Sequence, residues 1–468
     1  MFREIGKYKP LPMVSWYNLK QVAGTAFKSV VSLSKLSFAK AVLLSLIVAL
    51  QFSCASREII EKRKSLEPVT KSIKSIDPKD EDFSDLQFLK KIIERDSVQV
   101  VMLGEASHGD GSTFLAKSRL IKFLHKEAGF DVLAFESGLY DCTSGWERIK
   151  QSGKYYEEIR RAVFPLWVGT KECEDLLDYL QSTLTTTRPL ELSGFDSQIT
   201  GYSHHNCRVF CEELMKLTPD LLTQREENLF VKLACLEDEV KNGTNKTYNT
   251  SLLDKICLKF DSLAAMDRKY EYWKQLVYGV RATFKSTLTY KTNPETLRPD
   301  ADFSERDRQM GSNLVWLLNN KYKNRKVIVW AASFHNSRNL RELKTYNDSL
   351  SFVNSVYKKT STMGDVVYKA LGNKMYSILF TSYNGTSSNV VSTGASDLED
   401  ASEKSFENIM KGLGNELSYI DLRDPQNPEW IKQDFISRPF GHKEMIGKWS
   451  NVADGIFYIE EMKHSNFY

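Results

Sequence analysis

Short apolar runs alternate with longer amphipathic stretches along most of the chain. Five runs of four to six residues are apolar and rich in β-branched side chains, and polar residues follow each one: Val98–Leu103, Val132–Phe135, Leu190–Phe195, Val327–Ala331 and Tyr376–Phe380. Continuous apolar runs of this length predict strands that are buried on both faces, as in a parallel sheet.

The segment between the first two runs predicts a helix. Residues 113–130 carry their apolar side chains at helical spacing, and three residues suited to capping its start are Asp110, Ser112 and Thr113. Strand–helix–strand order predicts an α/β fold with a mostly parallel central sheet covered by helices. Ligands of such sheets bind beyond the carboxyl ends of the strands.

Two further stretches have a helical pattern. Residues 206–290 are rich in Leu, Lys and Glu and predict a helical insertion or cap beside the sheet, and Phe303–Tyr322 predicts one more amphipathic helix. The folded domain is expected over residues 83–468, because helical spacing begins near Phe83.

The first 53 residues have the layout of an export signal. Lys28, Lys35 and Lys40 precede the apolar run Ala41–Phe52, which is too short to span a bilayer, since about 20 residues are needed. Cys54 follows directly, as in a bacterial lipoprotein, although Gln51 and Phe52 depart from the usual pattern. We expect a signal at residues 1–53, lipidation of Cys54, and a lipid-anchored protein of the bacterial cell envelope.

Two alternatives to lipidation stay open, namely a cleaved, secreted protein and an uncleaved anchor. Residues 54–82 are charged and lack an apolar period, which predicts a polar tether between anchor and domain. Six cysteines follow Cys54 with no zinc-binding spacing, so that disulfides and buried thiols are both open.

The net charge of +4 belongs to the predicted signal. Residues 1–53 carry seven Lys/Arg and one Glu, a net of +6, and the remainder therefore has a net charge of −2. Nothing in this balance indicates nucleic-acid binding. We expect the protein to contact the membrane only through its lipid anchor.

Two glutamates and two histidines follow the predicted strands: Glu105, His108, Glu136 and His335. A charge directly after a buried strand is costly unless it is paired or lies in a solvated cleft. Because this recurs at several strand ends, we interpret the four residues as one general acid–base set rather than as separate helix caps or salt bridges.

The motifs around these residues resemble those of the erythromycin esterase family. The similarity covers about Phe83 to Glu461, and its last strand is expected at "DGIFYIEE", Asp454 to Glu461. The other motifs occur in this order: "LGEASHG", "LAKSRLIKFL", "GFDVLAFES", "ELSGFDSQ", "ERDRQMGSNLVWLL", "VIVWAASFH" and "MGDVVYKALG".

The resemblance implies a hydrolase acting on a small-molecule ester or lactone. His108 matches the family's essential histidine, the general base for an attacking water, while Glu105 and Glu136 match its two acids. His335 matches its second histidine. We assign Glu136 to hold the imidazole of His108, Glu105 to orient water or substrate, and His335 to stabilise the oxyanion or protonate the leaving alkoxide.

Further residues are expected to contact substrate. Lys117 stands where the family usually has arginine, Arg119 matches the next basic position, and Asp196 and Gln198 follow a predicted strand. Arg306 either pairs with Asp307 on its helix or reaches the site. The pair His204–His205 is interpreted as a surface pair, and His125, His442 and His464 as structural or exposed.

One departure from the family pattern concerns the substrate. The family commonly has W-A-H-N-x-H, but this chain has Ala332 and Ser333 in place of the first histidine and the asparagine. Macrolide hydrolysis is therefore in doubt. No cofactor is expected, yet two alternatives remain: a divalent metal held by the same Glu/His set, and a non-catalytic lipoprotein that binds a ligand in the same cleft.

Overall fold

The computed structural model describes residues 57–199, 205–238, 240, 246–291, 304–346, 351–389 and 392–468. The chain divides into two compact units, residues 1–62 and 63–468, and the account below concerns the second. The predicted signal and Cys54 lie outside the described residues, as does His204. No helix in the described part of the chain is long and apolar enough to cross a membrane.

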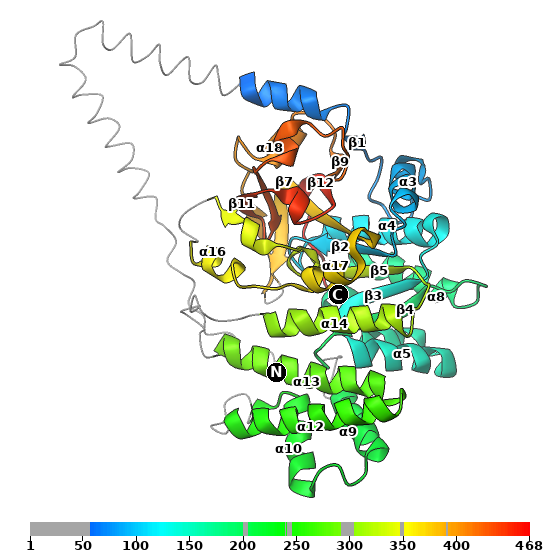
Figure 1. The fold of residues 1–468 in the computed structure, drawn as a ribbon. Helices are drawn as coiled ribbons and strands as arrows, with labels where there is room; N and C mark the ends of the chain where they lie inside the picture. The colour runs from blue at the N-terminus through cyan, green and yellow to red at the C-terminus, as the bar shows by residue number, and fades with distance from the viewer. Residues whose placement is uncertain are drawn as a thin grey trace, which may run out of the picture. The chain divides into compact units, whose positions relative to one another are not determined.

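A nine-stranded, mostly parallel sheet forms the centre of the second unit, as the sequence predicts (Figure 1). Its strand order is β1-β9-β12-β7-β2-β5-β3-β4, and β8 pairs with β7. The steps from β12 to β4 are all parallel, whereas β1, β8 and β9 pair antiparallel. The strands span β1 Lys71–Ser72, β2 Val100–Glu105, β3 Val132–Gly138, β4 Glu191–Asp196, β5 Val327–Ala332, β7 Met375–Asn389, β8 Ser392–Leu398, β9 Leu417–Asp421 and β12 Gly455–Met462.

Helices cover both faces of this sheet because side chains alternate along each strand. On β2, Val101 and Leu103 pack in one apolar cluster, while Val100 and Met102 pack in another. The first cluster includes α3 Gln87–Arg95, α4 Gly111–Ala128, α5 Leu139–Ser152, α6 Tyr155–Ala162, α7 Pro165–Val168 and α8 Glu174–Thr183. The second includes α14 Ser304–Asn319 and α17 Met363–Leu371.

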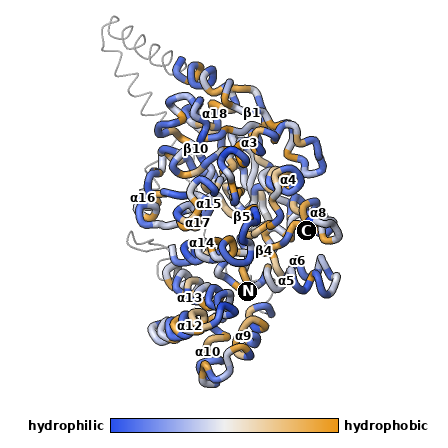
Figure 2. The backbone as a smooth tube through the Cα atoms, turned by 45° about the vertical axis from the view of Figure 1, so that its right-hand side comes forward, coloured by the Kyte–Doolittle hydropathy of each residue, from blue (hydrophilic) through white to orange (hydrophobic). Residues whose placement is uncertain are grey.

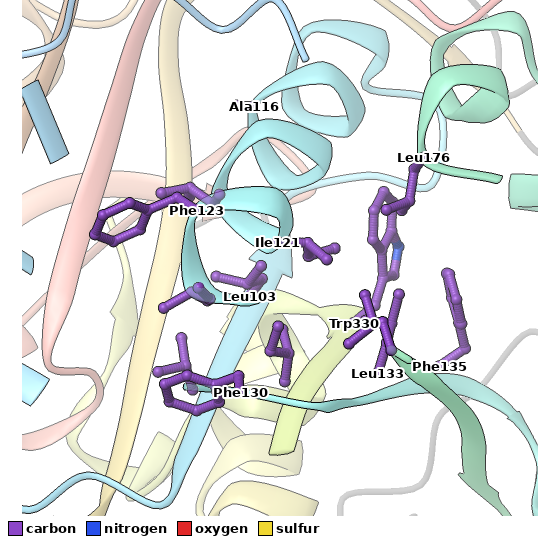
Figure 3. Packing of buried hydrophobic residues seen from close by; sticks show 14 of the residues in the cluster. Leu103, Ala116, Ile121, Phe123, Phe130, Leu133, Phe135, Leu176 and Trp330 are labelled. Carbon is purple, nitrogen blue, oxygen red and sulfur yellow. The ribbon is translucent and has the colours of Figure 1, made fainter. Parts of the chain in front are cut away.

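Helix α4 lies directly over the strands that carry the site. Figure 3 shows Ile121 and Phe123 of this helix beside Leu103, with Trp330 and Phe135 on the neighbouring strands. Each is at most 1 % exposed, and burying one such side chain stabilises the fold by about 1.5–3 kcal/mol. The loop between β2 and α4 is therefore held at both ends by rigid elements.

The predicted cap over residues 206–290 is largely helical where the structure describes it, and it lies at one end of the second unit (Figure 1). Its helices include α9 His205–Leu217, α10 Gln224–Ala234, α12 Lys246–Met266 and α13 Tyr270–Lys291. Figure 2 shows hydrophobic and hydrophilic positions alternating along them, which is the pattern of helices with one buried side. A disulfide joins Cys207 to Cys235, whereas Cys142, Cys173, Cys211 and Cys257 are free and buried.

The predicted tether is wrong over its second half. Residues 63–82 belong to the folded unit, because Lys71–Ser72 pairs with β9 and Leu66, Val69 and Ile73 are buried. The apolar residues of this segment are too far apart to show a period. Leu66 and Val69 pack in one apolar cluster of the folded unit, and Ile73 packs in another.

A small antiparallel sheet with the order β10-β11-β6 lies beside the active-site loop. It comprises β6 Lys344–Thr345, β10 Phe435–Phe440 and β11 Lys443–Gly447, and the short helices α16 Ser351–Tyr357 and α18 Phe406–Lys411 follow β6 and β8 in the chain. The backbone N–H of Gly441, at the tip of the β10–β11 hairpin, donates to the carbonyl of Ala106 at 2.8 Å. The hairpin tip thereby contacts the loop that carries His108.

Candidate active site

The loop from Ala106 to Asp110 joins β2 to α4 and places His108 beside the strand end. Backbone atoms of other segments approach it closely. A Cβ on Gly109 would lie 1.8 Å from the carbonyl oxygen of Ser388, and one on Gly104 would lie 2.7 Å from Cα of Ser333. Neither glycine has a positive φ. These glycines are therefore required by close backbone packing around the loop.

Glu105 holds the imidazole of His108. Its Oε1 lies 3.0 Å from Nδ1 of His108 and accepts from the indole N–H of Trp167 at 3.3 Å. Its Oε2 contacts the ammonium of Lys117, and both of these side chains are fully buried. Because the amine of Lys117 and the carboxyl group of Glu105 are in contact, the pair has no net charge, and the fold does not bury an unpaired charge at Glu105.

One ring nitrogen of His108 contacts Glu105 and the other is accessible. When its Nδ1–H donates to Glu105, its Nε2 carries the lone pair, and no described residue forms a hydrogen bond with Nε2. The side chain is 26 % exposed, which leaves this nitrogen accessible to water or substrate. A carboxylate bound to Nδ1 of a histidine favours the tautomer that has its lone pair on Nε2.

A second group of charged residues surrounds Glu136. Its Oε1 lies 3.0 Å from Nη2 of Arg306 and 3.2 Å from Nε2 of His335, and its Oε2 accepts from the backbone N–H of Ala332 at 3.0 Å. The other ring nitrogen of His335 lies 2.7 Å from Oδ1 of Asp307. Both nitrogens of His335 are thus bonded to carboxylates.

These contacts set three protonation states. Burial alone would lower the pKa of His335, but Asp307 and Glu136 raise it to about 10, so His335 is a cation at neutral pH. Burial alone would raise the pKa of Glu136, but His335, His108 and Arg306 hold it well below its usual range. Burial lowers the pKa of His108, and although Glu136 opposes this, His335 and Arg306 add to it. His108 is therefore neutral at pH 7.

The four strand-end residues converge, but the roles predicted for Glu105 and Glu136 are wrong, and of the two roles predicted for His335 only oxyanion stabilisation fits. Glu105, not Glu136, contacts the imidazole of His108, while Glu136 binds His335 and Arg306. His335 has a raised pKa and no free nitrogen, which makes it a fixed positive charge rather than a proton donor. Which carboxylate reaches the imidazole depends on side-chain direction at the strand end, which the sequence pattern does not specify.

The residues predicted to contact substrate fall into two groups: Arg306, Asp196 and Gln198 bind one another near Glu136, whereas Lys117 and Arg119 are buried away from any substrate. Arg306 forms a bidentate pair with Asp196 (3.0 and 2.7 Å), and the amide oxygen of Gln198, in its better-bonded orientation, accepts from Nε of Arg306 at 2.7 Å. Lys117 is fully buried against Glu105 and cannot reach a substrate. Arg119 is wrong as a substrate contact: it is buried and binds Asp85 and the carbonyls of Ser75, Asp80 and Asp82.

Of the two alternatives for Arg306, the structure shows the second: Arg306 reaches Glu136, and Asp307 pairs with His335 instead. Adjacent residues on a helix do not face each other, which disfavours an ion pair between them. Trp167 is buried, and its ring lies edge-on to His108 with centroids 5.8 Å apart.

The close packing at Gly109 gives a first prediction. Gly109→Ala places a methyl group against the carbonyl of Ser388, so we expect the loop to shift, catalytic activity to fall at least tenfold, and stability to fall by about 1–3 kcal/mol. Thermal unfolding and initial rates measure both effects. Gly394→Ala is the control, because nothing lies within 4 Å of its added Cβ. Full activity of the Gly109 variant would show that the loop has room to adapt.

Asp307→Asn tests the charge of His335. The pKa of His335 is raised above its unfolded value of about 6.5, so the stability from its ion pairs is full below that pH and is lost as the pH rises through about 10. We expect the variant to lose about 1–3 kcal/mol at pH 6 and far less near pH 10. Unfolding measured at both pH values checks this. An equal loss at the two pH values would contradict a charged His335.

The site does not fit a divalent metal ion. Among the described residues, no group of three or more His, Cys, Asp or Glu side chains is placed to hold one. The carboxylates of Glu105 and Glu136 are bound by Lys117 and by Arg306 with His335, and these cations would have to be displaced before a metal could bind.

The comparisons with known proteins agree with this architecture. A model of the erythromycin esterase family matches residues 125–461. The chain is 24 % identical to YbfO of Bacillus subtilis (strain 168), whose name assigns it provisionally to the hydrolases, over 88 % of this chain and 94 % of that protein. It is also 24 % identical to erythromycin esterase type II of Escherichia coli, over 82 % and 93 % of the two chains.

Solved structures have the same fold. A Bacillus cereus protein superposes with a TM-score of 0.68 at 21 % identity, covering 88 % of this chain and 99 % of its own. A histidine-to-asparagine variant of the erythromycin esterase EreC, in its open conformation, gives 0.66 at 17 % identity, covering 83 % and 96 %. The fold is mixed α/β with a mostly parallel central sheet, and the comparisons identify the chain as a hydrolase. The chain belongs to the erythromycin esterase family.

Proposed function

We propose that this hydrolase cleaves an ester or lactone with a water activated by His108. The observation that carries the proposal is the 3.0 Å contact between Glu105 Oε1 and His108 Nδ1, which leaves Nε2 as the free base at a partly exposed position. A neutral imidazole of lowered pKa accepts a proton from water near neutral pH.

The proposed reaction has two steps. Nε2 of His108 takes a proton from water as the hydroxide oxygen attacks the carbonyl carbon, and the carbonyl π electrons move to the oxygen. The positive charges of Arg306 and His335, which help to lower the pKa of His108, are proposed to stabilise this oxyanion. When the oxyanion collapses, the C–O bond to the leaving group breaks, and the alkoxide takes the proton from the His108 imidazolium. Glu105 stabilises that imidazolium in both steps.

Water is proposed as the direct nucleophile because the group placed as the base is His108 and no serine hydroxyl contacts it among the described residues. Ser107, its neighbour, instead has its hydroxyl 3.4 Å from the backbone N–H of Gly109. We propose a substrate other than a macrolide, since Ala332 replaces a histidine that the family commonly has. Ala332 offers only its backbone N–H, which is bound to Glu136.

A panel of activated esters, lactones and macrolides tests the function. Turnover by the wild type that is lost in both His108→Ala and Glu105→Gln supports it, and turnover of macrolides would contradict the proposed substrate class. Tight binding of a panel member with no turnover in the wild type would support the alternative, a ligand-binding lipoprotein.

We also propose that the protein is exported and anchored by a lipid on Cys54. The disulfide between Cys207 and Cys235 supports an oxidising compartment. Cys54→Ser is expected to move the protein from the detergent phase to the aqueous phase in a detergent-partitioning assay, and to remove the lipid mass from the mature N-terminus. Unchanged partitioning would contradict the anchor.

A further inference from the structure

A cavity lies beside the loop that carries His108, and the four residues of the candidate site do not line it. It has a volume of about 540 Å³ and lies between β6, β8 and the β10–β11 hairpin. Typical small-molecule sites have volumes of about 300–1,000 Å³. Its lining includes Arg438 and His442 together with Ser402 and Lys443, and the proposed function uses none of these residues.

Arg438 lines this cavity and has one donor without a partner among the described residues. The residue is 4 % exposed, its Nε donates to the carbonyl of Ser382 and its Nη1 donates to that of Glu399, but its Nη2 has no described protein partner. No described carboxylate forms an ion pair with its guanidinium. A buried guanidinium that is only partly bonded is costly unless a ligand with an acceptor oxygen completes it.

Two further polar atoms at the cavity lack described partners, namely Nδ1 of His442 and Oγ of Ser402. The side chain of His442 is 6 % exposed. With Lys443 on the rim, these groups suit an oxyanion, because a guanidinium, an ammonium and a hydroxyl all donate to anionic oxygens.

The opposite wall of the cavity has a different chemistry. Asp397, Glu399 and Asp400 are exposed there, and Glu444 lies beside Ser402, whose backbone N–H donates to it at 2.7 Å. Carboxylates on this wall would repel a plain polyanion but accept hydrogen bonds from hydroxyl groups. A ligand that can bond to both walls is a molecule with one oxyanion group and several hydroxyl groups.

His442 connects this cavity to the catalytic loop. It follows Gly441 at the hairpin tip, and their φ values of 55° and 56° are those of a two-residue turn that strongly favours glycine or asparagine. Its Nε2 lies 3.0 Å from Oδ1 of Asp110, and Oδ2 of Asp110 accepts from the backbone N–H of Ser107 at 2.9 Å. His108 lies between Ser107 and Asp110 in the same loop.

We propose that this cavity binds an acidic sugar or a sugar phosphate, with the oxyanion on Arg438 and the hydroxyl groups on the carboxylate wall. Through His442 and Asp110, the bound ligand restrains the loop that carries His108. The binding step requires no turnover, so its failure and the failure of the proposed esterase function are distinguishable.

Calorimetric titration of the full chain tests the site with four probes: glucuronate, glucose 6-phosphate, inorganic phosphate and glucose. We expect one of the two anionic sugars to bind at least tenfold more tightly than glucose and inorganic phosphate, and the better of the two identifies the oxyanion. Failure of both anionic sugars to bind would overturn the proposal, as would equal binding of glucose.

Three variants locate the binding. Arg438→Lys, which removes the planar donor but keeps the charge, is expected to weaken binding at least tenfold. Lys443→Glu, on the exposed rim, is expected to weaken it several-fold even if the Arg438 variant does not fold. Lys369→Glu on α17 is the matched control and is expected to have no effect. Unchanged binding in Lys443→Glu would place the ligand elsewhere and overturn the assignment.

Hydrogen exchange tests the connection to the loop. Saturation with the better-binding sugar is expected to slow amide exchange over residues 106–110 in the wild type, and to have a smaller effect in His442→Ala. Binding without any change in this exchange would overturn the proposed connection.

Discussion

His108→Ala is expected to lower kcat/KM by about 10²–10⁴, because it removes the group that takes the proton from water. Stability should change by less than about 1 kcal/mol, since His108 is 26 % exposed and its side chain forms one hydrogen bond with the described residues, to a glutamate that keeps its Lys117 and Trp167 contacts. Initial rates on an active ester and unfolding in denaturant measure the two quantities. Retained activity would exclude His108 as the base.

His125, a buried histidine away from the site, is the control, because its substitution is expected to lower stability and to leave kcat/KM nearly unchanged. His125 is 6 % exposed, and its ring nitrogens bond to the hydroxyl of Tyr179 at 2.6 Å and the carbonyl of Arg188 at 3.0 Å. His125→Ala is expected to lower stability by about 2–4 kcal/mol while kcat/KM stays within about threefold. The two variants together separate a catalytic from a structural histidine.

Lys117→Met is expected to lower the free energy of unfolding by about 3–5 kcal/mol. Burial lowers the pKa of Lys117 well below its usual range, and the substitution leaves Glu105 fully buried without the amine that contacts it, which is the costly way to break a buried pair. Activity should fall as well, because Glu105 no longer has a fixed position beside His108. Chemical denaturation at pH 7 and initial rates give both values.

Two further variants make this prediction specific. Lys117→Met combined with Glu105→Gln removes both charges, so we expect most of the stability to return while kcat/KM stays low. Lys122→Met is the matched control on the same helix: its partner Asp175 is 25 % exposed, so its loss costs less, and activity is kept. Full activity of the double variant would contradict the role of Glu105.

The sequence predicts the sheet and the convergence of four residues at its edge, because both follow from simple rules; the four are Glu105, His108, Glu136 and His335. Apolar runs locate β2, β3, β4, β5 and β7 to within two residues at their start. Since the carboxyl ends of parallel strands meet at one edge, the residues after them converge. The helical cap follows from composition in the same way.

The sequence does not specify which glutamate contacts which histidine among these four residues. Glu105 and Glu136 occupy equivalent positions after parallel strands, and only the surrounding cations distinguish them: Lys117 from α4 and Arg306 from α14. Arg119 lies two residues from Lys117 on the same helix and hence on a different side of it, where it binds residues 75–85. That segment was itself predicted to be a tether, so its role as Arg119's partner could not be foreseen.

The pH dependence of kcat/KM tests the central claim, that neutral His108 is the base beside a charged His335. We predict an acid limb governed by one group with a pKa below 6.5, a plateau through neutral pH, and a decline near pH 10 as His335 loses its proton. The acid limb should be absent from the residual activity of His108→Ala. An acid limb with a pKa above 8, or one that persists unchanged in that variant, would contradict the account.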